Sequence, residues 1–256
     1  MTRQNVRLVL VLIAIIVAVR FYQRSERRSE EAPREVREVQ QLNDELRPPA
    51  SVEAKDGLAA AIAIDVSGSM DEKVAGEGGR QERKIEIARR AALDLVSQFA
   101  SYARDHADEP VRLAIFEFSR RRGEADCRPV VPMAAPDRER AAAAIARLEA
   151  DGGTPIGRAM VTAKRALDET GLSRRHLLVV TDGENTDDIA PDTVTVAINK
   201  RPDPERPAIY FVAFDVDANR FSRVRDAGGL VLSAANATEL NTTLDSLLRG
   251  KILVEK

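Results

Sequence analysis

The chain has 256 residues, enough for one full-sized hydrophobic core and an appendage. Hydrophobic residues make up 44% and charged residues 31%, which excludes a disordered or fibrous protein. A net charge of -2 and the lack of tryptophan argue against a nucleic-acid binder, which needs a basic surface or aromatic stacking platforms. The single cysteine, Cys127, forms no intramolecular disulfide and does not indicate a redox compartment.

Near the amino terminus, an uninterrupted apolar run covers Leu8–Val19 between Arg7 and Arg20. As a helix this run spans about 18 Å, less than the roughly 30 Å of a bilayer's hydrocarbon core. Crossing then requires residues 6–22, with both arginines extending toward the interfaces. We predict an uncleaved membrane anchor. A cleaved signal peptide is the alternative, although no small-residue cleavage site follows the run.

Arginines flank the apolar run on both sides, so the positive-inside rule does not decide its orientation. The short basic tail before it favours a single-pass protein whose domain is extracytoplasmic, in the periplasm. Residues 25–56 are charged, of mixed sign and interrupted by prolines, which is typical of a solvated stalk. Within this stalk, Glu35–Leu46 has the spacing of a short helix. The predicted segments are therefore an anchor or signal (1–24), a stalk (25–56), a domain (57–250) and a tail (251–256).

The rest of the chain alternates apolar strand patterns with helical patterns. Strands are predicted at Leu58–Ile64, Arg112–Phe118, His176–Thr181, Ala208–Phe214 and Leu230–Leu232, with Val130-Val131 as a short edge strand. Helices are predicted at Arg80–Tyr102, Arg138–Leu148, Ile156–Glu169, Asp192–Asn199 and Thr238–Leu248. This order predicts an α/β fold, a doubly wound and mostly parallel sheet flanked by helices, preceded by the N-terminal apolar helix. In such a sheet, ligands bind at the carboxyl ends of the strands.

Oxygen-bearing side chains follow the predicted strands at that edge. The first strand ends in Asp65-Val66-Ser67-Gly68-Ser69, and the strand 176–181 is followed by Asp182. Thr154 lies after two glycines and just ahead of a helix, where a tight backbone path brings its hydroxyl toward another loop. If the two strands pair, these five side chains form a set of hard oxygen ligands suited to Mg²⁺.

The set Asp65-x-Ser67-x-Ser69, Thr154 and Asp182 resembles the metal-ion-dependent adhesion site of von Willebrand factor type A domains. The resemblance covers about residues 57 to 250, and no position of the five-residue site is missing. It implies that the hydroxyls reach the metal, while the two aspartates act through bound water or as acidic support. Mg²⁺ is the expected ion, with Mn²⁺ or Ca²⁺ as alternatives. A carboxylate from an Asp or Glu of a protein partner completes the coordination in such sites, and the usual outcome is binding without catalysis.

Three other interpretations compete with a metal-dependent binding site. Serines beside Asp and Gly also serve as turn and helix-cap residues, but caps do not require partners in other segments. A phosphotransfer enzyme with Asp65 as nucleophile needs an acidic residue where the chain has Ser67. A cytosol-facing adaptor that works with an ATPase is the remaining alternative. The favoured hypothesis is a membrane-tethered, metal-dependent protein-binding module with no enzymatic activity.

Overall fold

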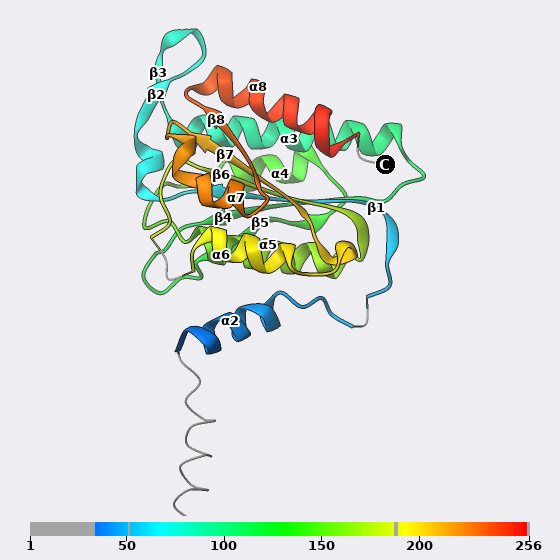
Figure 1. Ribbon diagram of the computed structural model, residues 1–256. Helices are drawn as coiled ribbons and strands as arrows, with labels where there is room; N and C mark the ends of the chain where they lie inside the picture. The colour runs from blue at the N-terminus through cyan, green and yellow to red at the C-terminus, as the bar shows by residue number, and fades with distance from the viewer. Residues whose placement is uncertain (1–33, 51, 187–188, 255–256) are drawn as a thin grey trace, which may run out of the picture. The chain divides into compact units, whose positions relative to one another are not determined.

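The computed structural model describes residues 34–50, 52–186 and 189–254 (Figure 1). The chain divides into a unit that ends at Asp44 and a unit that comprises Glu45–Lys256. All strands of the described residues lie in the second unit. The four segments expected from the sequence stay a prediction.

Six strands form the main sheet, in the spatial order β5-β4-β1-β6-β7-β8. Neighbouring strands are parallel except for β4 and β5, which confirms the predicted doubly wound, mostly parallel α/β sheet. The strands are β1 (Lys55–Asp65), β4 (Val111–Phe118), β5 (Cys127–Ala134), β6 (Leu172–Thr181), β7 (Ala208–Phe214) and β8 (Leu230–Ala234). Because both faces of the sheet are covered, the central strand β1 is buried from Gly57 to its end.

Helices cover both faces of the sheet (Figure 1). One face carries α3 (Lys84–Asp105), α4 (Arg138–Ile145) and α8 (Ala237–Leu247). The other carries α5 (Ile156–Thr170), α6 (Pro191–Asn199) and α7 (Ser222–Asp226). The remaining short helical turns are η1 (Gly68–Asp71), η2 (Glu77–Gly79), η3 (Asp203–Glu205), η4 (Ala218–Phe221) and η5 (Leu248–Ile252).

The sequence of β1 explains how the helices approach the sheet. Ile62 and Ile64 belong to the core beneath α3 and α8. The intervening Ala61 and Ala63 point to the opposite face, because side chains alternate along a strand. Their small side chains leave room for α5, which contacts β1 closely.

A small hairpin interrupts the region where a long helix was expected. The strands β2 (Lys73–Ala75) and β3 (Gln81–Arg83) pair antiparallel, so α3 begins at Lys84 and the helix predicted from Arg80 was too long. At the hairpin tip, Gly78 and Gly79 have φ values of 71° and 77°, which glycine adopts most readily. Four residues of the predicted helix therefore belong to a turn and a strand, and Lys84 is the first residue of α3.

The helix α2 (Arg34–Glu45), all but the last residue of which belongs to the first unit, agrees with the short helix expected within the stalk. Its sequence, REVREVQQLNDE, is polar and charged. In the part of the chain that the structure describes, no helix combines the length and apolar content needed to cross a bilayer.

That finding contradicts the predicted single-pass anchor, the extracytoplasmic location inferred from it, and the apolar helix expected before the domain. The physical reason is visible in the sequence. The run Leu8–Val19 has 12 residues, whereas a spanning helix needs about 20. Residues 6–22, on which the prediction depended, lie outside the described residues.

Candidate metal centre

The carboxyl ends of β1 and β6 bring the predicted site residues together. These two strands are parallel neighbours, with Ile64 opposite Val180. Asp65 ends β1 and Asp182 directly follows β6, so both leave the sheet at the same edge. From the sequence, we expected the site residues to meet only if these two strands pair. The two strands do pair.

Asp65 lies at the bottom of the site and is fully buried. Its carboxylate accepts hydrogen bonds from the Ser67 amide (2.8 Å) and from Thr181 Oγ1 (2.5 Å), both of which are neutral donors. The pKa of Asp65 is raised to about 7, mainly by burial and to a smaller extent by the charge of Asp182. The hydrogen bonds lower this pKa but do not outweigh burial. An ionised carboxylate at this position is therefore stabilised by any positive charge placed close to it.

The two serines connect Asp65 to Asp182. Ser67 Oγ lies 3.1 Å from Ser69 Oγ, and Ser69 Oγ donates to Asp182 Oδ1 at 2.7 Å. The chain turns into the short helix η1 at Gly68, and Ser69 is its second residue. Both hydroxyls thus lie between the two aspartates, as the resemblance implies.

Thr154 reaches the same edge because its loop is held on both sides. Gly152 has a φ of 84°, and a Cβ there would lie 2.3 Å from the carbonyl oxygen of Arg120, so only glycine fits. Gly153 and Arg120 exchange both backbone hydrogen bonds. The Thr154 amide donates to Thr186 Oγ1 at 2.7 Å, and the Thr186 amide donates to the Thr154 carbonyl at 2.9 Å. These contacts fix the position of the Thr154 hydroxyl.

The donor set fits a divalent cation. A Cβ added to Gly183 would lie 3.5 Å from Thr154 Oγ1 and 3.8 Å from Ser69 Oγ, so both hydroxyls face one space that no side chain fills. Hydroxyl and carboxylate oxygens are the ligands that Mg²⁺, Mn²⁺ and Ca²⁺ prefer. Among the described residues, no group of three or more His, Cys, Asp or Glu side chains is suited to a metal. Coordination at this edge would therefore depend on Ser67, Ser69 and Thr154 as well as on the two aspartates.

A buried lysine accompanies the site. Lys84 is 3% exposed, and its Nζ lies within 2.9–3.0 Å of carboxylate oxygens of Glu72, Asp182 and Asp215. Burial lowers the pKa of Lys84, but its hydrogen bonds to the three carboxylates outweigh burial, and the pKa lies above its usual value. Lys84 is therefore a permanent positive charge beside Asp182.

Several of these partners were not recognised from the sequence, namely Lys84, Thr181, Asn185, Thr186 and Asp215. Thr181 and Thr186 lie within five residues of Asp182, so the local Thr-Asp-Gly-Glu-Asn-Thr segment carried a signal for them. Asn185 Oδ1 accepts from the Ile156 amide at 2.9 Å and thereby caps α5. Asp215 directly follows the apolar strand β7, a signal like the one that marks Asp182, whereas no local pattern points to Lys84. Two residues after Asp182, Glu184 forms an ion pair with Arg220.

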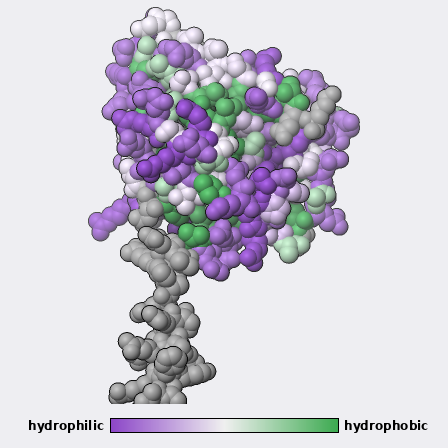
Figure 2. Space-filling view, viewed as in Figure 1, coloured by the Kyte–Doolittle hydropathy of each residue, from purple (hydrophilic) through white to green (hydrophobic). Residues whose placement is uncertain are grey.

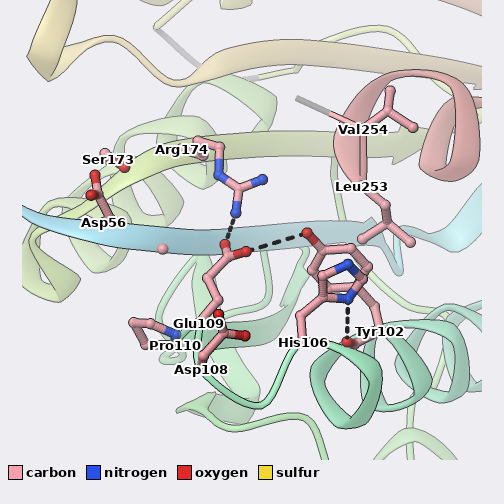
Figure 3. A pocket seen from close by; sticks show the side chains of 11 residues that line it. Asp56, Tyr102, His106, Asp108, Glu109, Pro110, Ser173, Arg174, Leu253 and Val254 are labelled. Carbon is pink, nitrogen blue, oxygen red and sulfur yellow. Dashed lines mark hydrogen bonds and ion pairs between the residues drawn. The ribbon is translucent and has the colours of Figure 1, made fainter. Parts of the chain in front are cut away.

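A hollow of about 990 Å³ lies at the opposite edge, where β1, β4 and β6 begin (Figure 3). Its polar side chains contact one another: Arg174 pairs with Glu109, and Tyr102 Oη donates to Glu109 Oε2 at 3.4 Å. His106 stacks on Tyr102 with ring centroids 4.0 Å apart. Arg174, Glu109, Tyr102 and His106 thus contact one another within the hollow, and none of the predicted site residues lines it.

Comparison with known proteins agrees with the fold. Residues 60–184 match the family model of the von Willebrand factor type A domain. The structure is similar to the PilB minor pilin from Streptococcus sanguinis, with 13% identity, a TM-score of 0.57, and 81% of this chain and 63% of that chain covered. It is also similar to a von Willebrand factor type A structure from Catenulispora acidiphila, with 21% identity, a TM-score of 0.57, and 75% and 42% covered. The pilus adhesin SpaC from Lactobacillus rhamnosus GG is similar at 12% identity, with a TM-score of 0.58, and 79% and 31% covered.

No curated protein matches the chain by sequence. The chain spans less than two thirds of the length of the three structures named above, and identities of this size show the fold alone. The match to the family model and the shared fold agree with each other and with the order of strands around β1. Residues 60–184, just under half of the chain, are therefore similar to the von Willebrand factor type A domain, and the fold agrees with that similarity.

Proposed function

We propose that the domain is a protein-interaction module that binds its partner through a divalent cation. The residues that would hold the cation are Asp65, Ser67, Ser69, Thr154 and Asp182, and an Asp or Glu carboxylate of the partner would complete the coordination. One observation carries this proposal: the hydroxyls of Ser69 and Thr154 face one space beside Gly183, with Asp182 and Asp65 behind them. A cation bound there supplies a positive charge that the neutral hydroxyls do not cancel, and an incoming carboxylate is attracted to it.

The burial of these residues supports access from one side. Asp65 and Asp182 are buried at 0% and 7% exposure, while Gly68 is exposed and Ser69 is half-buried. The aspartates are therefore shielded from direct contact with a partner. A carboxylate from solvent would approach past Gly68 and meet the Ser69 hydroxyl first, because Ser67 and Thr154 are as buried as the two aspartates.

The surface of the domain also favours recognition by charge and hydrogen bonding. The face seen in Figure 2 is mainly hydrophilic, and hydrophobic side chains occupy separate areas of it. In the described part of the second unit, three large hydrophobic residues are exposed, namely Val196 on α6, Leu230 on β8 and Val254 after η5. So few exposed hydrophobic residues do not favour binding through a broad apolar surface.

Among the similar structures, one is a pilus adhesin and another a minor pilin. Their names support a role in binding other proteins for this domain as well. This chain spans 63% or less of each of those proteins, so the proposal concerns the domain and not their full activities.

Calorimetric titration of the full chain with Mg²⁺, Mn²⁺ and Ca²⁺ tests the metal. We expect saturable binding and a higher melting temperature for the wild type, and neither effect for Asp65→Ala. Asp151→Ala is the matched control, because Asp151 is a highly exposed aspartate of the loop that carries Thr154. Wild-type protein that shows no heat and no change in melting temperature, indistinguishable from Asp65→Ala, would defeat the proposal.

Acetate serves as the probe for the carboxylate of the partner. With Mn²⁺ bound to the protein, the acetate methyl proton signal should broaden more than Mn²⁺ and buffer alone produce, because a coordinated carboxylate lies next to the paramagnetic ion. Asp65→Ala should abolish the excess broadening. Equal broadening with both proteins would show that the site does not accept a carboxylate.

We also infer that the domain is not an enzyme. The phosphotransfer alternative lacks the second acidic residue, because Ser67 stands two positions after Asp65. Hydrolysis of a generic phosphoester that is lost in Asp65→Asn would contradict this inference.

A further inference from the structure

Lys84 is held by carboxylates from three separate segments of the chain. Glu72 lies before the hairpin, Asp182 follows β6, and Asp215 follows β7. The Lys84 amide also donates to the Glu72 carbonyl at 2.9 Å, which closes the base of the hairpin. The Asp182 carboxylate bonded to Lys84 is the same one that accepts from Ser69 Oγ.

The arrangement is costly for local structure. As the first residue of α3, Lys84 places a positive charge at the positive end of the helix dipole, where acidic residues are favoured. Asp215 is the only non-glycine residue with positive φ in the described chain, at 54°, and this conformation directs its carboxylate to Lys84. Neither feature is needed to pack α3 on the sheet, so both point to a role at the metal centre.

The charges around Lys84 remain unbalanced. One ammonium group faces Asp182, Asp215 and Glu72, and Asp65 lies behind Asp182 without a cationic partner among its contacts in the described chain. Lysine therefore neutralises only part of the negative charge at this edge. A divalent cation can add the remainder, whereas a monovalent cation brings no more charge than the ammonium already present.

We propose that Lys84 competes with the divalent cation for Asp182 and thereby sets the affinity of the site. This inference rests on the proposed function, since it assumes that the site takes a cation. Without metal, Lys84 and Ser69 keep the Asp182 carboxylate oriented, so the site stays assembled. With metal, the carboxylate is shared between two positive charges, and their repulsion weakens metal binding. A partner carboxylate relieves that repulsion, so it strengthens the binding of the metal.

Mg²⁺ titration of the full chain by calorimetry tests the competition in the wild type, Lys84→Met and Lys73→Met. Lys84→Met should bind Mg²⁺ at least about tenfold more tightly, which is what removing one charge about 6 Å from a divalent ion gives even at the dielectric constant of water. Lys73→Met is the matched control, because Lys73 is an exposed lysine of the same hairpin and has no contact with Asp182 among those described. Its affinity should stay within about twofold of wild type, since charges exposed to solvent are screened.

The outcomes separate the two proposals. Mg²⁺ binding to the wild type with unchanged or weaker binding to Lys84→Met would overturn the competition and leave the proposed function standing. No Mg²⁺ binding to wild type or to Lys84→Met would overturn both. Equal strengthening in Lys84→Met and Lys73→Met would also overturn the competition, because net charge alone would explain it.

Two further arms guard against a variant that does not fold. Lys84→Gln is also neutral but keeps a hydrogen-bond donor, and it should bind Mg²⁺ more tightly than wild type as well. In wild-type protein with ¹³C-labelled lysine, the Lys84 Cε signal should move along the Mg²⁺ binding isotherm while the Lys73 signal stays. A Lys84 signal that does not respond while Mg²⁺ binds would overturn the competition without any variant.

Discussion

Two buried lysine–aspartate clusters in this domain use the same residue types for different purposes. At the carboxyl edge of the sheet, Lys84 meets three carboxylates, two of which are partly exposed. On the face covered by α5, Lys164 is fully buried and lies 2.5 Å from Asp168, which also accepts from Arg175 at 2.8 Å. The Lys164 ammonium additionally donates to the Leu46 carbonyl at 2.6 Å.

The difference lies in which charge is in excess. Around Lys84 the carboxylates outnumber the cation, and the pKa of the lysine is raised. Around Asp168 the two cations outnumber the acid; burial lowers the pKa of Lys164 although Asp168 raises it. In the Lys164 cluster, the ammonium also donates to a backbone carbonyl, and no carboxylate is in excess that would attract a metal ion. We therefore interpret it as a structural lock that ties residues 45–46 to α5, and the Lys84 cluster as part of a binding site.

The largest expected effect comes from the same substitution in each cluster. Asp168→Asn should lower the free energy of unfolding by about 3–5 kcal/mol, because Lys164 and Arg175 then lie buried without a counter-charge. Asp182→Asn in metal-free protein should cost clearly less, about 1–2 kcal/mol, since Glu72 and Asp215 still pair with Lys84. Urea unfolding measures both.

With Mg²⁺ added, the ranking of those two variants should change. Asp168→Asn should keep the full stabilisation by Mg²⁺, and Asp182→Asn should lose it. Equal losses of stability in the two variants without metal would break the comparison between the clusters.

The pH dependence of stability sharpens the comparison next. Burial raises the pKa of Asp65 from its ordinary value of 3.8 to about 7, so the folded protein keeps this proton over a pH range in which the unfolded chain has lost it. Unfolding therefore releases a proton between these values, and metal-free stability falls as pH rises through this range. Asp65→Asn removes this slope, so its stability relative to wild type should increase by up to about 4 kcal/mol from pH 4 to pH 7. Saturating Mg²⁺ should remove the slope from wild type. Parallel pH profiles of the two metal-free proteins would contradict the buried, ionisable Asp65.

His176 gives a smaller slope of opposite sign. Burial, together with the smaller effect of the charge of Arg174, lowers its pKa from 6.5 to about 4. The unfolded chain binds a proton that the folded one does not, so stability is lost as pH falls from 6.5 to about 4, by up to about 3 kcal/mol. His176→Asn should flatten this part of the urea-unfolding profile. His106→Asn is the control, because His106 is exposed and should leave the profile unchanged. A wild-type slope in both variants would assign the proton to another group.

The smallest effect concerns the positioning of Thr154. Thr186→Val removes the acceptor of the Thr154 amide and should cost about 1 kcal/mol in urea unfolding. It should also weaken Mg²⁺ binding severalfold, because the Thr154 hydroxyl is no longer fixed. Thr242→Val is the control, since the exposed Thr242 hydroxyl donates to the Thr238 carbonyl on α8, away from the site. Unchanged Mg²⁺ affinity in Thr186→Val would show that the loop holds Thr154 by its backbone alone.

The sequence by itself determined the sheet and the candidate donors. Apolar runs such as Leu58–Ile64 predicted buried parallel strands, because strands covered on both faces carry few polar side chains. Asp65 and Asp182 stand directly where such runs end, so local order was enough to find them. Two predictions from local order were wrong. The predicted start of α3 at Arg80 ignored the glycines of the hairpin, and the 12-residue apolar run is shorter than the membrane anchor predicted from it requires.

Only the tertiary structure decided which charges surround the donors. Lys84, Glu72 and Asp215 are spread over more than 140 residues and meet because α3 starts where β6 and β7 end. Asp215 directly follows the apolar strand β7, as Asp182 follows β6, but nothing in the neighbours of Lys84 or Glu72 along the chain distinguishes them from surface residues. Charge balance at a site depends on distances through space, and pairing of strands and helices sets those distances. The donors could be found in the sequence because they sit at strand ends, whereas the lysine that competes for them could not.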